Sequence, residues 1–319
     1  MKNKNMSNFV LNLRNQENGN IKFKISKFPD GQQDVTITNV EEINRQPYFR
    51  DATIKSSLSS FKDLELILCA TESLKRLKFK EIHLYIPYIL GARSDRQFVE
   101  GGNSYLRDVV APIINSQNYE TVTCIDPHSD VASACIDRLQ IIDNNKLFNF
   151  ALKDYFIEDK KLDNSDYSKF ILVSPDAGSM KKIYKISDNF NYKGDIIVCS
   201  KHRDENGKLS KTIVPITGEQ HNMLHKGPYK DFFIIDDICD GGRTFINIAK
   251  EIKEYFHESG CTESNIYLVV THGIFSAGIY ELSKYFKKIY CTNSFSDLNV
   301  SEHSDYTVDE NFVKQLNVY

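Results

Sequence analysis

Short apolar runs without polar alternation recur along the chain and predict strands that are buried on both faces. The central run, Phe232 to Ile235, is followed at once by Asp236 and Asp237. Such runs are typical of parallel sheets whose two faces are covered by helices. A helix-like segment, Thr244 to Phe256, comes soon afterwards. The pattern therefore predicts a strand, a polar loop and a helix in succession.

Other segments carry the same kinds of pattern. Leu58 to Leu77 places its apolar residues on one helical face, which predicts an amphipathic helix. Residues 21–27 alternate apolar and polar positions, which predicts a strand. Further strands are predicted at residues 8–13, 34–38, 82–86, 121–125, 170–173, 195–200 and 266–270. Together these segments predict an α/β protein.

A polar stretch, Asp154 to Ser168, indicates a surface connection between two halves of the chain. The second half repeats the first in outline, because its buried strands also end in polar loops. We therefore predict one domain over residues 1–152 and a second over residues 153–299, each long enough for its own core. The tail, residues 300–319, is predicted to dock back on the first domain.

Composition narrows the class of protein. A net charge of −3 gives no overall attraction to nucleic acid or to an anionic membrane. The seven cysteines are scattered and never spaced as C-x-x-C, which predicts free thiols in a reducing compartment. No apolar span is long enough to cross a bilayer, and the N-terminus lacks the apolar core of a secretory signal. We expect a cytoplasmic protein with no nucleic-acid or membrane partner.

The loop after the central strand combines carboxylates with glycines. Asp236 and Asp237 are followed by Asp240, Gly241 and Gly242. In open α/β sheets, ligands bind outside the carboxyl ends of the strands. Ionised carboxylates accept hydrogen bonds from a sugar diol, whereas glycines and a helix N-terminus allow a phosphate to approach the backbone. The loop therefore predicts a ribose phosphate site; the alternative is a tight strand-to-helix turn capped by Asp.

Polar loops after two other strands add candidate residues. Arg93 and Arg96 follow residues 82–86, and forked guanidinium donors suit a polyphosphate. His128 follows residues 121–125 and has an aspartate two positions away on each side, which makes it a candidate for magnesium or phosphate contact. The alternative for the two arginines is that they lie on a solvated loop and bind no ligand. The alternative for His128 is a structural role.

The string Ile-Asp-Asp-Ile-Cys-Asp-Gly-Gly-Arg-Thr, residues 235–244, resembles the phosphoribosyl-binding signature of the type I phosphoribosyltransferase fold. Over residues 20–315 the chain resembles the ribose-phosphate pyrophosphokinases (phosphoribosyl pyrophosphate synthetases). Five further segments, all earlier in the chain, occur in that family's order. They are Phe28–Gln32, the loop of Arg93, Asp126-Pro127-His128, Ser174-Pro175-Asp176-Ala177-Gly178-Ser179 and Lys201-His202-Arg203. The resemblance implies two tandem phosphoribosyltransferase-like domains, each a mainly parallel sheet flanked by helices.

The resemblance also implies an activity. Enzymes of that family transfer the pyrophosphoryl group of Mg-ATP to the C1 hydroxyl of ribose 5-phosphate, giving phosphoribosyl pyrophosphate and AMP. The implied ATP-binding residues are Phe28, Asp30, Gln32, Arg93, Arg96 and His128. The implied ribose 5-phosphate residues are Asp236, Asp237, Asp240, Gly241, Gly242, Arg243 and Thr244, with His128 and Asp176 for Mg²⁺ and with Lys201 and Arg203 as catalytic cations. A homo-oligomer is implied, because the family's counterpart of Phe28 contacts a neighbour's ATP.

Several positions depart from that family's pattern. Among them, Gly241 replaces a usual threonine, Arg243 a glycine, Gln32 a glutamate and His202 an arginine. Three alternatives therefore stay open. The acceptor could be a larger 5-substituted ribose such as ADP-ribose. The chain could instead be a phosphoribosyltransferase that uses phosphoribosyl pyrophosphate, or a non-catalytic regulatory homologue.

Overall fold

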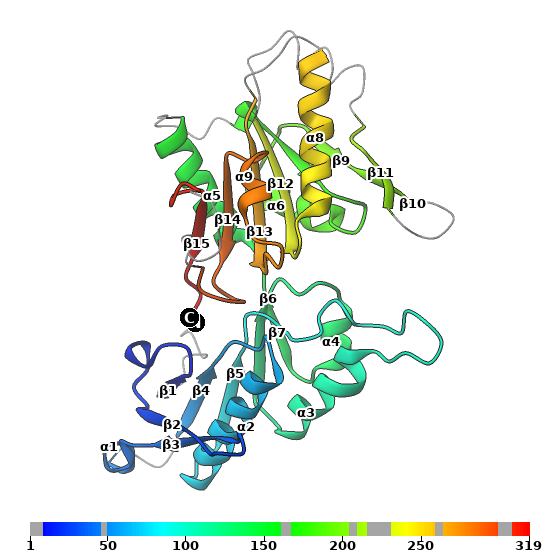
Figure 1. Cartoon of the computed structure of the whole chain (residues 1–319). Coiled ribbons are helices and arrows are strands. Elements are labelled where there is room, and N and C mark those ends of the chain that lie inside the picture. The colour runs from blue at the N-terminus through cyan, green and yellow to red at the C-terminus, as the bar shows by residue number, and fades with distance from the viewer. Residues whose placement is uncertain are drawn as a thin grey trace. The chain divides into compact units, whose positions relative to one another are not determined.

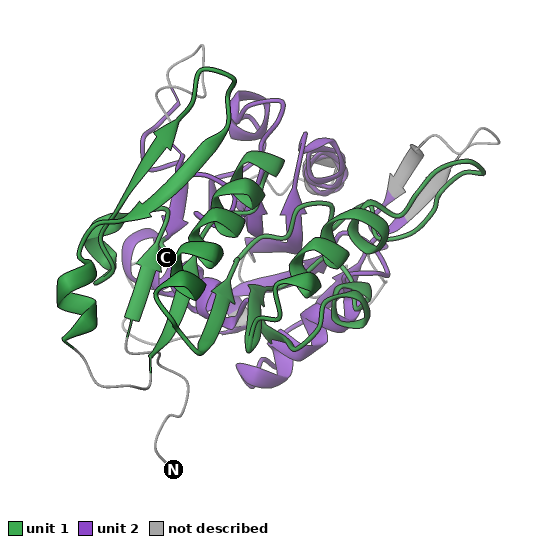
Figure 2. Cartoon of the chain, turned by 90° about the horizontal axis from the view of Figure 1, so that it is seen from below, with its two compact units in different colours: residues 1–143, 317–319 green, residues 144–316 purple. Residues whose placement is uncertain are grey.

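The computed structural model describes residues 9–45, 50–160, 167–203, 209–215, 231–258, 264–298 and 308–319, and the side chains of residues 168, 201–212 and 256–258 lie outside this description. The chain divides into two compact units, unit 1 with residues 1–143 and 317–319 and unit 2 with residues 144–316 (Figure 2). Each unit has its own parallel sheet flanked by helices, as predicted. No described helix is long and apolar enough to cross a membrane.

Unit 1 is built on a parallel sheet, five-stranded within the described residues, in the order β1-β4-β5-β6-β7 (Figure 1). The strands are β1 (Phe9–Asn12), β4 (Asp51–Lys55), β5 (Glu81–Tyr85), β6 (Thr121–Ile125) and β7 (Leu139–Ile142). Their apolar side chains meet the inner face of helix α2 (Phe61–Arg76) in one core. Ser60 and Asp63 form a capping box that starts this helix, which confirms the predicted amphipathic helix.

Shorter elements complete unit 1. The strands β2 (Phe23–Lys27) and β3 (Gln33–Ile37) form an antiparallel hairpin, which the alternating pattern predicted. The helical elements are η1 (Gln16–Asn18), α1 (Val40–Asn44), the π-helix η2 (Tyr105–Val110), α3 (Ala111–Ser116) and α4 (Val131–Cys135). The loops after β5 and β6 leave the carboxyl ends of two neighbouring parallel strands, so they start at the same edge of the sheet.

Unit 2 is built on a larger parallel sheet, in the order β15-β14-β13-β12-β8-β9. The strands are β8 (Phe170–Ser174), β9 (Ile196–Val198), β12 (Asp231–Cys239), β13 (Ile266–Gly273), β14 (Lys288–Thr292) and β15 (Val313–Leu316). Helix α8 (Arg243–Glu258) and the short α9 (Tyr280–Ser283) share one apolar core with the sheet. A second core joins the sheet to α5 (Asn145–Asp154), η3 (Tyr155–Asp159), η4 (Tyr167–Lys169) and α6 (Met180–Asn189). Both faces are therefore covered, as the uninterrupted apolar runs indicated.

The central strand is longer than the sequence pattern indicated. β12 continues through Asp236 and Asp237 to Cys239, because β13 extends alongside it. Asp236 lies opposite Val270 in the parallel register, and Ile238 lies opposite His272. The two aspartates thus lie on the last part of the strand rather than on a loop after it.

The division of the chain differs from the predicted boundary, which falls inside α5. Buried side chains of α5, such as Phe148, pack in the second core, and Asp154 accepts hydrogen bonds from Lys288 and Tyr290 of β14 at 2.7 and 2.9 Å. These contacts place the whole helix in unit 2. The C-terminal residues divide as well. β15 pairs with β14, whereas residues 317–319 belong to unit 1, where the Tyr85 hydroxyl donates to the Val318 carbonyl.

Candidate functional site

A pair of carboxylates lies near the end of the central strand of unit 2. Asp237 is 6% exposed and Asp236 is partly exposed. Asp236 Oδ1 accepts hydrogen bonds from Ser179 Oγ at 2.7 Å and from the Asp237 backbone N–H at 2.9 Å. Lys182 Nζ lies 3.5 Å from Asp237 Oδ1 and is mostly buried. Ser179 and Lys182 both come from the start of α6, so this helix end supplies a hydroxyl and a cation to the pair.

The carboxylate pair holds a proton at a higher pH than an isolated aspartate does. Burial, together with the charge of Asp237, raises the pKa of Asp236 to about 7, while Lys182 and the Ser179 hydrogen bond act in the opposite direction. Two adjacent carboxylates in a low-dielectric site resist full ionisation. A ligand that brings hydroxyl donors would stabilise the ionised form, which suits recognition of a sugar diol.

Asp176 lies on the loop after β8, the strand that pairs with β12. Its Oδ1 accepts hydrogen bonds from the backbone N–H groups of Gly178 and Ser179 at 2.9 and 3.2 Å. Among the described residues, no cluster of three or more His, Cys, Asp or Glu side chains could hold a metal. Magnesium at phosphoryl-transfer sites takes one or two carboxylates and completes its shell with water and substrate phosphates. A single carboxylate such as Asp176 therefore fits that mode of binding.

The structure requires glycine at only one of the two positions 241 and 242 that follow β12. Gly242 has φ of +76°, and a Cβ there would lie 2.9 Å from Leu282 Cδ2, so the fold requires glycine. A Cβ on Gly241 would meet Ser276 Oγ at 3.8 Å and Ala277 Cβ at 3.9 Å, which are ordinary contacts. Ser276 Oγ also donates to Asp240 Oδ1 at 2.5 Å, which fixes the first residue of the loop.

Arg243 and Thr244 begin helix α8 directly after this loop. Thr244 is half-buried, whereas Arg243 is exposed. Within the described part of the chain, the Arg243 guanidinium has no hydrogen bond or ion pair. The helix N-terminus presents unpaired N–H groups and a positive dipole end, which favour an anion. The loop and helix start can therefore bind a phosphate.

Unit 1 brings together the loops of Arg93, Arg96 and His128. Buried Asp95 accepts a hydrogen bond from Ser129 Oγ, which joins the loop after β5 to the loop after β6. Arg96 Nε lies 3.8 Å from Asp95 Oδ1. Arg93, Arg96 and His128 are exposed at this edge of the sheet, where they can meet a polyphosphate. Sequence reasoning did not single out Asp95, although its position between two arginines was a signal.

The turn Phe28–Gln32 closes the β2–β3 hairpin. The Phe28 N–H donates to the Gln32 carbonyl at 2.8 Å, and Asp30 Oδ1 accepts from the Gln32 N–H at 3.2 Å. Phe28 is 50% exposed, so core packing does not explain this aromatic residue. Among the described residues of unit 1, no hydrogen bond or ion pair joins this turn to the loops of Arg93 and His128.

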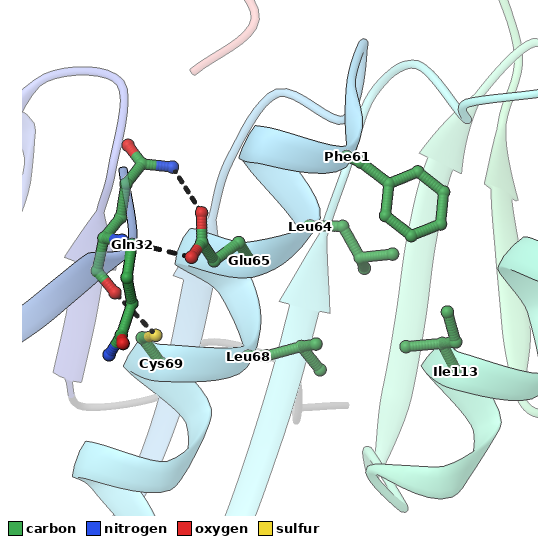
Figure 3. A pocket seen from close by; sticks show the side chains of 8 residues that line it. Gln32, Phe61, Leu64, Glu65, Leu68, Cys69 and Ile113 are labelled. Carbon is green, nitrogen blue, oxygen red and sulfur yellow. Dashed lines mark hydrogen bonds between the residues drawn. The ribbon is translucent and has the colours of Figure 1, made fainter. Parts of the chain in front are cut away.

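Gln32 instead borders a shallow hollow of about 390 Å³ against α2 and α3 (Figure 3). The side chains around it are mainly apolar: Phe61, Leu64, Leu68 and Ile113, with Cys69 at one side. Glu65 accepts hydrogen bonds from the backbone N–H and the side-chain amide of Gln33, which hold the hairpin against α2. The hollow offers no cation for a phosphate.

Lys201 and Arg203 lie on strand β10 (Ser200–Arg203), which pairs antiparallel with β11 (Leu209–Ile213). The extended backbone has a bulge between His202 and Arg203. The side chains of both cations lie outside the described part, so their predicted catalytic role stays a prediction.

Comparison with known proteins shows what the chain is similar to. No protein-family model matches the chain. A ribose-phosphate pyrophosphokinase of Thermosipho africanus is 27% identical over 243 residues, which are 76% of this chain and 69% of that protein. One of Ureaplasma parvum is 28% identical over 271 residues, covering 85% of this chain and 73% of that protein. Over most of its length the chain is thus similar to ribose-phosphate pyrophosphokinases, at 27–28% identity to these two proteins.

The fold agrees with this similarity. The crystal structure of phosphoribosylpyrophosphate synthetase from Mycobacterium smegmatis matches with a TM-score of 0.68 at 17% identity, over 93% of this chain and 86% of that one. The two-unit α/β architecture is therefore shared with this synthetase.

Proposed function

We propose that the chain transfers the pyrophosphoryl group of Mg-ATP to the C1 hydroxyl of a ribose 5-phosphate group, giving a 5-phosphoribosyl 1-pyrophosphate and AMP. The observation that carries the proposal is the carboxylate pair of β12 next to the two-glycine loop and the start of α8. In a chain similar to ribose-phosphate pyrophosphokinases, that arrangement offers acceptors for ribose hydroxyls and backbone donors for a phosphate.

Unit 2 binds the acceptor. Asp236 and Asp237 accept hydrogen bonds from the ribose 2- and 3-hydroxyls, and Ser179 and Lys182 hold the carboxylates in place. The N–H groups of the loop from Asp240 to Thr244 surround the 5-phosphate. The C1 hydroxyl is then left as the free nucleophile of the sugar.

Unit 1 binds the donor. Arg93 and Arg96 meet the polyphosphate, with His128 beside them, and the exposed ring of Phe28 stacks on adenine in a neighbouring subunit of a homo-oligomer. His128 of unit 1 and, separately, Asp176 of unit 2 are the residues that would contact Mg²⁺, which neutralises phosphate charge when bound. The hydrogen bonds that Gly178 and Ser179 donate to Asp176 orient its carboxylate.

The reaction breaks one bond and forms one. The C1 oxygen forms a bond to the β-phosphorus, and the bond from that phosphorus to the α–β bridging oxygen breaks. AMP leaves with the electron pair, and the hydroxyl proton passes to solvent. Lys201 and Arg203 stabilise the charge that grows on the transferring group, where one lost electrostatic partner typically costs about 3–4 kcal/mol of barrier. No covalent enzyme intermediate is required.

Acceptor-dependent AMP release from ATP and Mg²⁺ tests this function, with release in the absence of a sugar as the background. Asp237→Asn should abolish most of the acceptor-dependent release, because the amide weakens both the sugar contact and the Lys182 ion pair. Asp188→Asn is the matched control, since Asp188 is an exposed residue of α6. AMP release that does not depend on a sugar, or an Asp237→Asn variant as active as the control, would exclude the proposed role.

A further inference from the structure

The packing of unit 2 does not require the residue types found at two positions of the loop from Asp240 to Thr244, namely Gly241 and Arg243. Gly241 does not have a positive φ, is exposed, and would accept a Cβ with contacts no shorter than 3.8 Å. Its neighbour Gly242 shows the contrast, because both its φ and the 2.9 Å approach to Leu282 exclude a side chain. Unit 2 can therefore accept a side chain at position 241, and Gly241 is exposed at the surface.

Arg243 is placed against the electrostatic preference of its helix. It is the first residue of α8, where the dipole favours negative side chains and disfavours cations. Its guanidinium is exposed and has no hydrogen bond or ion pair with any other described residue. A forked cation in this position lowers helix stability slightly unless an anion binds to it.

We propose that these two residues select an acceptor whose 5-phosphate is esterified, namely a ribose linked through a 5-diphosphate to a further group, as in ADP-ribose. The inference rests on the proposed function and names its substrate class. A phosphomonoester exposes three terminal oxygens, and a side-chain hydroxyl at position 241 would help to satisfy them. A diphosphate leaves its first phosphorus with two terminal oxygens and a bridging oxygen that must leave the loop.

Gly241 provides that exit. The diphosphate passes through the space beside Ser276 and Ala277, and the group beyond it lies in solvent. Arg243, two residues further on, donates its paired N–H groups to the second phosphate. The reaction at C1 is unchanged, because the terminal ribose of ADP-ribose has a free C1 hydroxyl, and the products are AMP and a 1-pyrophosphorylated ADP-ribose.

Steady-state AMP release from the full chain with ATP and Mg²⁺ compares ribose 5-phosphate with ADP-ribose. We expect kcat/KM for ADP-ribose to be at least about tenfold higher, the effect of one charged hydrogen-bonding group. Arg243→Ala should lower kcat/KM for ADP-ribose by about tenfold to a hundredfold, and by a larger factor than it lowers kcat/KM for ribose 5-phosphate. Gly241→Thr should lower ADP-ribose use and keep or raise ribose 5-phosphate use. Lys250→Ala, which removes an exposed cation from the same helix, should change neither.

Calorimetric binding of ADP-ribose without ATP gives a readout that does not depend on turnover. Arg243→Ala should weaken it by a factor like that in kcat/KM, and thermal melting of each variant shows whether it is folded. A preference of the wild type for ribose 5-phosphate, or an equal loss for both acceptors in Arg243→Ala, overturns the inference and leaves the proposed function standing. No acceptor-dependent AMP with either sugar overturns both.

Discussion

Asp236→Asn should make the ligand-free protein more stable at neutral and alkaline pH although it removes a sugar contact. Burial and the neighbouring Asp237 raise the pKa of Asp236 from 3.8 to about 7 in the folded chain. Between these values the folded state holds a proton that the unfolded state has lost. Stability therefore falls as the pH rises from about 4 to about 7, and the loss is complete above that range.

The magnitude follows from the size of the shift. A difference of about three pH units at about 1.4 kcal/mol each gives an upper limit of about 4 kcal/mol at alkaline pH. Asparagine has the shape of the protonated carboxyl, and its Oδ1 can still accept the hydrogen bonds from Ser179 Oγ and the Asp237 N–H. The variant should thus match the wild type near pH 4 and exceed it near pH 8, with about 2–4 °C in Tm for each kcal/mol.

The assay is thermal unfolding of both proteins across this pH range, without substrates and with a chelator present. Titrating groups remote from the carboxylate pair cancel in the difference between the variant and the wild type. Asp188→Asn, the same change at an exposed position of α6, should show no such pH-dependent difference. If Asp236→Asn is less stable than the wild type near pH 8, or if the difference does not change with pH, the account of the carboxylate pair is wrong.

Other changes separate structural from functional residues. Gly242→Ala should lower stability by about 1–3 kcal/mol, because alanine at that positive φ is strained and collides with a leucine, whereas Gly241→Ala should be nearly neutral in chemical denaturation. Lys182→Met should weaken ribose binding and raise the pKa of Asp236 further, which a shift of the kcat/KM–pH profile to higher pH would show. Lys201→Ala should lower kcat at least about a hundredfold with sugar binding nearly intact, as single-turnover and binding measurements can show.

The sequence predicted the elements that hold the site but not the contacts between them. The apolar run 232–235 indicated a strand buried on both faces, and the structure confirms it because both faces of the sheet carry a core. Its extension through Asp237 depends on the neighbouring β13, which no local pattern reports. The predicted boundary falls inside α5, whereas Phe148 of that helix packs in the second core of unit 2, and no local pattern reports such a contact.

The same limit applies to the candidate site. Ser179 and Asp236 are 57 positions apart, and their hydrogen bond exists because α6 begins beside the end of β12. The sequence does not distinguish Gly241 from Gly242. Only the positive φ of Gly242 and its short distance to Leu282 show that glycine is required at position 242 and not at position 241. The resemblance identified the residue types of the site, whereas burial and partners came from the fold.

The most direct test of the central claim follows the phosphates of ATP. In a reaction with Mg²⁺, ATP and a 5-phosphorylated ribose, phosphorus NMR resolves the products. The account predicts that the β- and γ-phosphates appear together on C1 of the sugar and that one AMP forms for each sugar consumed. Formation of ADP with a single new phosphate on the sugar, or AMP with free pyrophosphate and an unchanged sugar, would contradict it.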